Sequence, residues 1–517
     1  VYSALTCYYD FELDDKVHIN ISDRADLLEG ASYYYLNRID INPTEYEFHF
    51  RGTADWLRNV ITHEFTHMVS LQRSMKYPRR LPSFFLQAIS FEKEKRPDVI
   101  TGYPNFQGSV PLPGEVVPNW FAEGVAQYQC DVARNDIWDS HRDMLLRTAA
   151  LNGDLLSLDE MSVFGKGSLD AEMLYNQGFS LVRFIAEEYG RDRIPGIMRA
   201  LGGTFRLGFD GACREVLGMG EEELYDRWCA SIEAGYREAA AAIAADAREG
   251  RRIAGKGFMN LFPVPDRRRE SVLFLSNRGG DYSGTDLVEA AGEKTETVFP
   301  DASTRFDLSP NGSALCVAKR TRDNDHGYRF YDLFIIERET GKSRRLTRSL
   351  RATDPAFSAD GSAVACVVDE GGSQRIAVVE TADGSHRTIT PTVPGRQYFG
   401  LSWSGEGIYA ARFDGGSRDI VLVDPEGGAE RTIVAGPADE RDPAADGEGG
   451  CFFSSDRTGI FNIYHRNAGG EELRVTNTIG GAFAPRPDGD GIVFTAFGAD
   501  GYLSLIHISE PTRLRRI

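Results

Sequence analysis

The sequence lacks the features that would place the chain inside a membrane or on a nucleic acid. No uninterrupted apolar run approaches the roughly 18 residues that a membrane-spanning helix requires. The chain has 58 Lys and Arg against 77 Asp and Glu, a net charge of −19. This acidity argues against a phosphate-backbone partner, which requires a basic face. With 41% hydrophobic and 26% charged residues, the composition is that of a globular protein.

Cysteine is scarce, and the start of the chain carries no targeting signal. Seven cysteines in 517 residues do not make a disulfide framework. Cys316, Cys366 and Cys451 lie in apolar, strand-like runs, so we interpret them as core residues. The sequence begins at Val1 without a Met, so an export signal upstream would not be visible, and its absence tells nothing.

The last residues are unusual. The stretch LSLIHISEPTR, from Leu503 to Arg513, resembles the reading-frame translation of a transposase adaptor used in sequencing libraries. We therefore expect residues 503–517 to be a non-native tail outside the fold, and the natural protein to continue beyond Tyr502.

At this length two or more domains are expected, and the chain divides into two regions with different sequence patterns. The first, residues 1–250, mixes strand-like runs with amphipathic helical segments and predicts an α+β domain. We expect strands at 17–22, 37–42 and 45–50, and helices at 55–72, 119–133, 172–189 and 221–247. Residues 251–257 are interpreted as a linker.

From residue 258 the long helices end and a repeat begins. Gly341, Gly384, Gly428 and Gly470 stand in similar turn sequences at spacings of 43, 44 and 42 residues. A period of 40–45 residues made of short strands predicts the four-stranded blades of an all-β propeller. Residues 258–502 resemble the WD-type blades of TolB-like propellers.

We count five blades and the start of a sixth, so the propeller is expected to be truncated at its C-terminus. A ring left open has unpaired strand edges, and we expect residues 258–502 alone to aggregate or fold poorly.

The segment ITHEFTHMV, residues 61–69, carries the most specific chemistry. On a helix, His63 and His67 lie one turn apart and can offer imidazole nitrogens to one metal ion, while Glu64 points beside it. The sequence MVSLQR follows His67, so the Gly and third His of a metzincin are absent. A third ligand must come from elsewhere in the chain.

The segment PNWFAEGVAQY, residues 118–128, offers Glu123 as that ligand, 56 positions beyond His67. Small residues after Glu123, beginning with Gly124, are expected to let this helix pack closely on the histidine helix. HEFTH and WFAEGVAQY together resemble the gluzincin metallopeptidases of the peptidase-MA-like group. The resemblance implies Zn²⁺ held by His63, His67 and Glu123, with Glu64 as general base.

Further roles follow from the chemistry of a zinc peptidase and from this resemblance. Tyr175, 52 residues past Glu123, stands where gluzincins of the aminopeptidase type carry a tyrosine that stabilises the transition state, and His141 is the competing donor. Gln127 occupies the place of an aspartate that orients a ligand histidine in many gluzincins. Its amide oxygen could accept an imidazole N–H. The strand near residues 37–50 is a candidate to pair with the substrate backbone.

These observations predict a zinc-dependent peptidase, with endopeptidase or oligopeptidase action slightly favoured because no G-x-M-E-N-type segment precedes the histidines. Two alternatives stay open: a catalytically silent scaffold whose propeller binds a partner, and a metal-dependent hydrolase of another bond. We expect a bacterial, exported protein, periplasmic, cell-surface or extracellular. Its expected partners are a peptide or protein substrate and a cell-envelope protein bound by the propeller.

Overall fold

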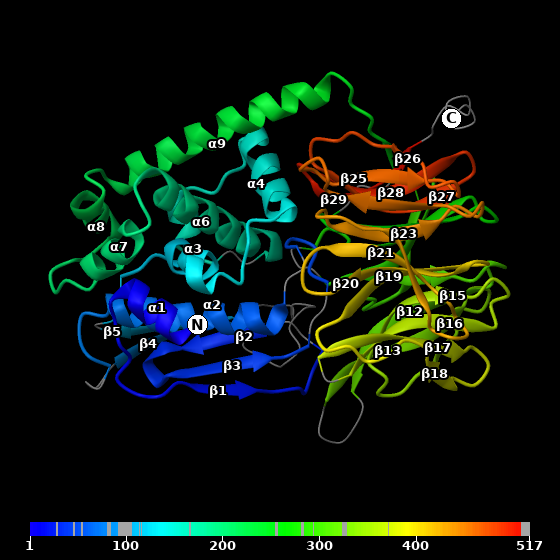
Figure 1. Ribbon diagram of the computed structural model, residues 1–517, viewed down its shortest axis with the longest axis horizontal. Coiled ribbons are helices and arrows are strands. Elements are labelled where there is room, and N and C mark those ends of the chain that lie inside the picture. Colours follow the sequence, from blue (N-terminus) through cyan, green and yellow to red (C-terminus); the bar gives the residue numbers. More distant parts are fainter. Residues whose placement is uncertain are drawn as a thin grey trace. The chain divides into compact units, whose positions relative to one another are not determined.

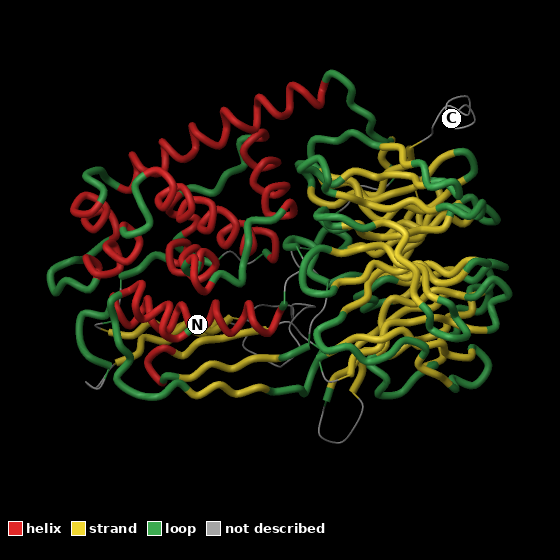
Figure 2. The backbone as a smooth tube through the Cα atoms, viewed as in Figure 1, coloured by secondary structure: helices red, strands yellow, loops and turns green. Residues whose placement is uncertain are grey.

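The computed structural model divides the chain into two compact units (Figures 1 and 2). The helical unit comprises residues 1–22, 28–43 and 54–238, and the propeller unit comprises residues 23–27, 44–53 and 239–517. The structure describes residues 1–26, 29–44, 47–52, 55–79, 84–90, 106–112, 114, 116–164, 167–253, 257–280, 284–292, 294–322, 328–370 and 372–507.

The helical unit is built mainly of helices, with one small three-stranded sheet. Its helices are α1 (Tyr2–Tyr9), α2 (Trp56–Ser74), α3 (Asn119–Tyr128), α4 (Ser140–Asn152), α5 (Leu158–Met161), α6 (Ser168–Glu188), α7 (Arg193–Leu201), α8 (Phe209–Val216) and α9 (Glu221–Ala244), with short 3-10 turns at Tyr34–Leu36 and Asp131–Ala133. The helices expected at 55–72, 119–133, 172–189 and 221–247 correspond to α2, α3 with its following turn, α6 and α9. None of the described helices combines the length and the apolar character needed to cross a bilayer.

The small sheet has the order β1-β3-β2, with β1 at His18–Ile21, β2 at Glu29–Tyr33 and β3 at Arg38–Asn42. β3 is the central strand, parallel to β1 and antiparallel to β2. A second, two-stranded ribbon pairs β4 (Phe84–Ser90) with β5 (Phe106–Leu112). In the described residues β2 is hydrogen-bonded along one edge only.

Helix α2 packs against this sheet, as its sequence pattern predicts. The Asp55 carboxylate caps its first turn by accepting from the backbone N–H of Arg58 at 3.2 Å. Val60, Met68 and Val69 are nearly or fully buried at helical spacing, whereas Leu57 stays 37% exposed. Burial of this apolar stripe fixes which face of α2, and therefore which of its polar residues, turns toward α3.

The propeller unit consists of six antiparallel sheets of four strands each among the described residues, so the predicted blade architecture is confirmed. The first three sheets are β7 (Asn260–Asp266), β8 (Ser271–Ser276), β9 (Asp286–Ala291) and β10 (Lys294–Phe299); β11 (Phe306–Leu308), β12 (Ala314–Arg322), β13 (Arg329–Glu337) and β14 (Ser343–Arg345); and β15 (Ala352–Phe357), β16 (Ala363–Glu370), β17 (Ser373–Glu380) and β18 (His386–Thr388).

The remaining sheets follow the same order. They are β19 (Gln397–Ser404), β20 (Gly407–Phe413), β21 (Arg418–Val423) and β22 (Glu430–Val434); β23 (Glu440–Ala445), β24 (Cys451–Ser455), β25 (Asn462–Arg466) and β26 (Glu472–Arg474); and β27 (Gly481–Asp488), β28 (Gly491–Gly498), β29 (Gly501–His507) and β6 (Arg251–Arg252). The first strand of each sheet contacts the first strand of the next, and β27 contacts β7, so the six sheets close a ring.

The expectation of five blades and an incomplete sixth is wrong. The sixth sheet is complete because β6, which precedes the first blade, supplies its outer strand. Arg252 pairs with Leu505 and Arg251 with Ile506. Part of the predicted linker 251–257 is therefore a strand of the propeller, and in the full chain β6 covers the edge that residues 258–502 alone would leave open.

The predicted tail boundary at residue 503 is also wrong as a statement about the fold. Residues 503–507 form most of β29 and pair with β28, and Ser504 is fully buried. Residues 508–517 lie outside the described part of the chain.

The repeated glycines are explained by the turn that each blade needs. Gly341, Gly384, Gly428 and Gly470 have φ between 68° and 88° and stand between the third and fourth strands of their sheets. A side chain would be strained in that conformation. At Gly428 a Cβ would also lie 1.8 Å from the carbonyl oxygen of Ile389 in the preceding blade. The predicted core positions Cys316, Cys366 and Cys451 are fully buried.

Two short segments from the N-terminal part of the chain belong to the propeller unit, so the predicted domain range 1–250 is not continuous. Asp26 accepts from the backbone N–H of Tyr331 at 2.7 Å and pairs with Arg351 at 2.7 Å. Of the expected strand 45–50, residues 45–46 lie outside the described part of the chain, and residues 47–50 form no strand; residues 49 and 50 form a turn.

Glu47 lies within an arginine cluster formed by Arg305, Arg418 and Arg441. Its Oε2 lies 2.9 Å from Arg305, and its Oε1 lies 2.9 Å from Arg418 and 3.5 Å from Arg441. Burial would raise the pKa of Glu47, but the three guanidinium groups hold it well below its usual range.

Candidate metal centre

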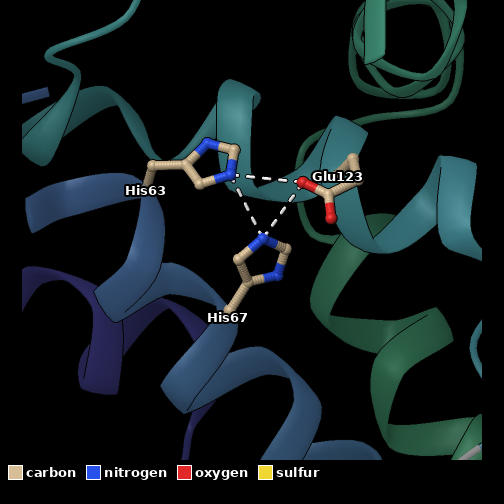
Figure 3. Close-up of side chains that lie close together, drawn as sticks. All are labelled: His63, His67 and Glu123. Atoms are coloured by element: carbon tan, nitrogen blue, oxygen red, sulfur yellow. Dashed lines mark hydrogen bonds and ion pairs between the residues drawn. The ribbon is translucent and has the colours of Figure 1, made fainter. Parts of the chain in front are cut away.

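His63, His67 and Glu123 converge on one point between α2 and α3 (Figure 3). The Nε2 atoms of His63 and His67 each lie 3.2 Å from Oε2 of Glu123 and 3.2 Å from each other. The three side chains are 13%, 8% and 13% exposed. Among the described residues this is the one group of three or more His, Cys, Asp or Glu side chains close enough to share a metal ion.

This triangle fits a metal ion better than a set of hydrogen bonds. Ligand atoms about 2.0–2.2 Å from a tetrahedral zinc stand about 3.3–3.5 Å from one another, close to the observed edges. If both Nε2 atoms donated to Glu123, their mutual 3.2 Å contact would join two N–H groups. One cation at the centre would satisfy all three ligand atoms.

The electrostatics of the group also favour a cation. Burial would raise the pKa of Glu123, but its contacts with His67 and His63 lower that pKa. Burial would lower the pKa of His67, whereas the carboxylates of Glu123 and Glu64 raise it. The centre therefore stabilises a buried carboxylate together with positive charge beside it.

Local contacts hold the histidine helix at this position. The side chain of Thr62 donates to the carbonyl of Arg58 at 2.8 Å and accepts from Asn135 Nδ2 at 2.8 Å. Asn135 therefore fastens the segment after α3 to the helix that carries both histidines. Asn135 could not be predicted from the sequence, because a single Asn in a loop has no recognisable pattern.

α3 packs on α2, as expected, and also on α6, and the closest contact, at its glycine, is made with α6. A Cβ on Gly124 would lie 2.3 Å from the carbonyl oxygen of Gly178, and a Cβ on Gly178 would lie 2.3 Å from the carbonyl oxygen of Trp120. Residues next to each other on a helix point about 100° apart. With Glu123 facing α2, Gly124 therefore faces α6.

Glu64 is 7% exposed and lies beside β2. A Cβ on Gly30 of β2 would come within 3.0 Å of Glu64 Oε1 and 2.4 Å of Val60 Cγ2. Only glycine fits here without displacing the carboxylate, so β2 approaches the candidate general base directly. Among the described residues the Glu64 carboxylate forms no hydrogen bond or ion pair.

Tyr175 of α6 lies next to the centre. Its ring centroid is 6.4 Å from that of His63, at an interplanar angle of 39°. The structure does not bring the competing donor, His141, into the ligand group; it lies in the first turn of α4, 2% exposed.

The hydrogen bond proposed for Gln127 is not formed. Both its amide atoms and His67 Nδ1 are buried without a hydrogen-bond partner among the described residues.

Comparisons with known proteins concern the fold. No protein-family model matches the chain. No curated protein matches its sequence. Among solved structures, TolB from Acinetobacter baumannii is 13% identical, with a TM-score of 0.33 over 53% of this chain and 69% of that one. The β-propeller domain of the Trilobed protease from Pyrococcus furiosus is 12% identical, with a TM-score of 0.35 over 49% of this chain and 97% of that domain.

A puromycin-hydrolysing peptidase from Mycobacterium tuberculosis is a further neighbour, 14% identical, with a TM-score of 0.37 over 52% of this chain and 46% of that one. The structural neighbours are thus TolB-like and peptidase β-propellers. The propeller assignment itself rests on the six four-stranded sheets.

Proposed function

We propose that this protein is a zinc-dependent peptidase of the gluzincin type. The observation that carries the proposal is the triangle of His63, His67 and Glu123 ligand atoms, with Glu64 beside it. Two imidazoles and one carboxylate are a ligand set of catalytic zinc sites, which keep a fourth position open for water or substrate. The function is the hydrolysis of peptide bonds.

The chain's own residues divide the work. When bound, zinc lowers the pKa of a coordinated water to about 7 and polarises a carbonyl group. The Glu64 carboxylate takes a proton from the attacking water and passes it to the leaving amine. Tyr175 donates a hydrogen bond to the oxygen on which negative charge develops. Both residues lie beside the ligand triangle, Glu64 on α2 and Tyr175 on α6.

The substrate backbone pairs with β2 in this proposal. The strand suggested by the sequence, near residues 37–50, cannot do so, because β3 already has a partner on each edge. β2 is paired on one edge among the described residues, and its Gly30 lies against Glu64. An extended peptide added to that edge would be held mainly by its main chain. This favours endopeptidase or oligopeptidase action.

The propeller contributes recognition rather than chemistry in this proposal. Its described residues contain no group of potential metal ligands. We propose that it recruits a protein substrate or a cell-envelope partner, and that the protein acts after export, in the periplasm, at the cell surface or outside the cell. The competing functions are a silent binding scaffold and a metal-dependent hydrolase of another bond.

The proposal is tested on the full chain, because segments 23–27 and 44–53 join the N-terminal half to the propeller unit. Metal content is measured after dialysis, and cleavage of a peptide library is followed by mass spectrometry with and without a chelator. One zinc per chain and chelator-sensitive cleavage are expected, with Glu64→Gln as the inactive, metal-retaining control. Absence of bound zinc would favour the scaffold. Zinc without peptide cleavage would favour a hydrolase of another bond.

A further inference from the structure

The rings of His63, Tyr175 and Phe164 form a continuous series that leads from the metal centre to solvent. Tyr175 lies 6.4 Å from His63 and 5.8 Å from Phe164, measured between ring centroids, with interplanar angles of 39° and 43°. Phe164 is 43% exposed, and its neighbour Val163 is 62% exposed. An apolar surface thus begins one ring away from a metal ligand and opens to water.

The segment that carries Phe164 is fixed to the elements of the centre. Asn119 at the start of α3 donates to the carbonyl of Ser162 at 3.0 Å. Gln177 of α6 accepts from the backbone N–H of Leu156 at 2.8 Å and donates to its carbonyl at 3.1 Å. The same helices that carry Glu123 and Tyr175 therefore hold this segment.

Its ring contact with Tyr175 distinguishes Phe164 from Phe205, a second exposed phenylalanine of the helical unit. Phe205, between α7 and α8, is 95% exposed. Phe164 instead contacts the ring of Tyr175 in a tilted arrangement and remains 43% exposed. Covering that ring and Val163 would remove apolar surface from water, a favourable change.

We propose that Phe164 and Val163 form the apolar wall of a substrate subsite and select a large apolar residue next to the scissile bond. The inference rests on the proposed peptidase function. The occupant is a side chain of the bound peptide, since a peptide bond held at the metal centre and beside Tyr175 places its flanking side chains close to this wall. Phe164 is a specificity-determining residue in this proposal, and Tyr175 remains the catalytic one.

The test compares cleavage of matched peptides that carry Phe, Leu, Gly or Asp beside the cleaved bond. The wild-type protein should prefer Phe or Leu. Phe164→Ala should reduce that preference by about tenfold through a higher KM for the apolar peptides, the scale of a lost apolar contact in a pocket. Phe164→Leu should restore most of it. Phe205→Ala, the exposed control, should leave the profile unchanged.

A purely structural role of Phe164 predicts a different outcome. If its ring only supported Tyr175, Phe164→Ala would lower kcat for all four peptides alike, including the glycine peptide. That result, or an unchanged preference, would overturn the subsite.

Binding without turnover separates this inference from the proposed function. Peptide hydroxamates with a Phe or a Gly side chain are titrated into the zinc-loaded protein by calorimetry. The Phe compound should bind about tenfold more tightly to the wild type, and this advantage should vanish in Phe164→Ala. Such a result would support the wall even if no peptide were cleaved. Equal binding of the two compounds, or no binding, would overturn it.

Discussion

Two carboxylates of low exposure, Glu123 in the helical unit and Glu47 in the propeller unit, differ in the side chains that surround them. Their side chains are 13% and 12% exposed, and in both the pKa is lowered although burial alone would raise it. Glu123 lies between two imidazoles, whereas Glu47 lies among three guanidinium groups.

The difference between these partners decides what each site can do. A neutral imidazole has a lone pair for a metal ion, but a guanidinium remains protonated in proteins and has none to offer. The Glu47 cluster can therefore only neutralise charge and join segments of the fold, and the Glu123 centre can hold a cation. Low exposure and a shifted pKa do not distinguish a reactive site from a structural one. The chemistry of the neighbours does.

The test of this comparison with the largest expected effect is the loss of the Glu123 carboxylate. Glu123→Ala is expected to abolish stoichiometric zinc binding and with it peptide cleavage, and His63→Ala should do the same. The loss of affinity should exceed the ~10–100-fold that removing an outer-shell partner costs. Metal is measured by mass spectrometry after dialysis, with Glu47→Gln as the control that keeps its zinc. Stoichiometric zinc in Glu123→Ala would remove Glu123 from the ligand set.

The second test changes Glu64, the proposed proton acceptor, and leaves the three proposed metal ligands in place. Glu64→Gln should retain one zinc per chain while kcat falls by roughly 10²–10⁴, because the amide keeps the shape of the side chain but cannot shuttle a proton. Zinc content and steady-state rates are measured on the same preparation. Wild-type rates would end the general-base assignment.

The third test concerns stability instead of activity. Glu47→Gln leaves three arginines with less negative charge among them, and breaking a buried ion pair costs about 3–5 kcal/mol. We expect the free energy of unfolding of the propeller to fall by that amount, which is measured as a transition at lower denaturant concentration. The exposed control, Glu448→Gln, should change it by less than about 0.5 kcal/mol. Equal effects of the two variants would show that the arginine cluster is not stabilising.

A smaller effect is expected at Tyr175. Tyr175→Phe should lower kcat by roughly 10²–10³ and leave KM nearly unchanged, since a donor to the developing oxyanion acts mainly in the transition state. A higher KM at constant kcat would make Tyr175 a binding residue and return His141 as the candidate donor.

The smallest effect is expected where β2 meets Glu64. In Gly30→Ala the new methyl group must displace Val60 or the Glu64 carboxylate. The fall in kcat should stay below the ~100-fold that a 1 Å misplacement can cost, with zinc content unchanged. Gly235→Ala, on the exposed face of α9 with open space around it, is the matched control. No difference between the two variants would separate β2 from the reaction.

Much of the fold could be predicted because it follows from local periodicity. The apolar spacing and the Asp55 cap define α2, and the glycine period defines the blades. The role of β6 in the sixth sheet could not be predicted, since its two arginines have no strand pattern and their partners lie about 250 residues away. Residues 47–50 were predicted wrongly for the opposite reason, because their alternation matched a strand, whereas Glu47 is held by ion pairs to residues far away in the sequence.

In the candidate site, too, the residues set by local sequence pattern could be predicted, and those set by packing between separate elements could not. His63 and His67 are related by one helical turn and were found by their spacing, and Glu123 was found by the resemblance of its neighbourhood. Phe164, Gly30 and Asn135 reach the centre only through the packing of separate elements, for which the sequence carries no signal. The close contact of Gly124 was foreseen, but its partner helix was not.

The closure of the sixth sheet by β6 has a consequence for folding during synthesis on the ribosome. Arg251 and Arg252 leave the exit tunnel about 250 residues before the strand that pairs with them. At synthesis rates of about 5–20 residues per second, roughly 10–50 s pass between the synthesis of β6 and that of β29. The interval between the synthesis of Asp26 and that of its partners Tyr331 and Arg351 is longer still. The nascent chain therefore has to remain unaggregated while these segments are unpaired.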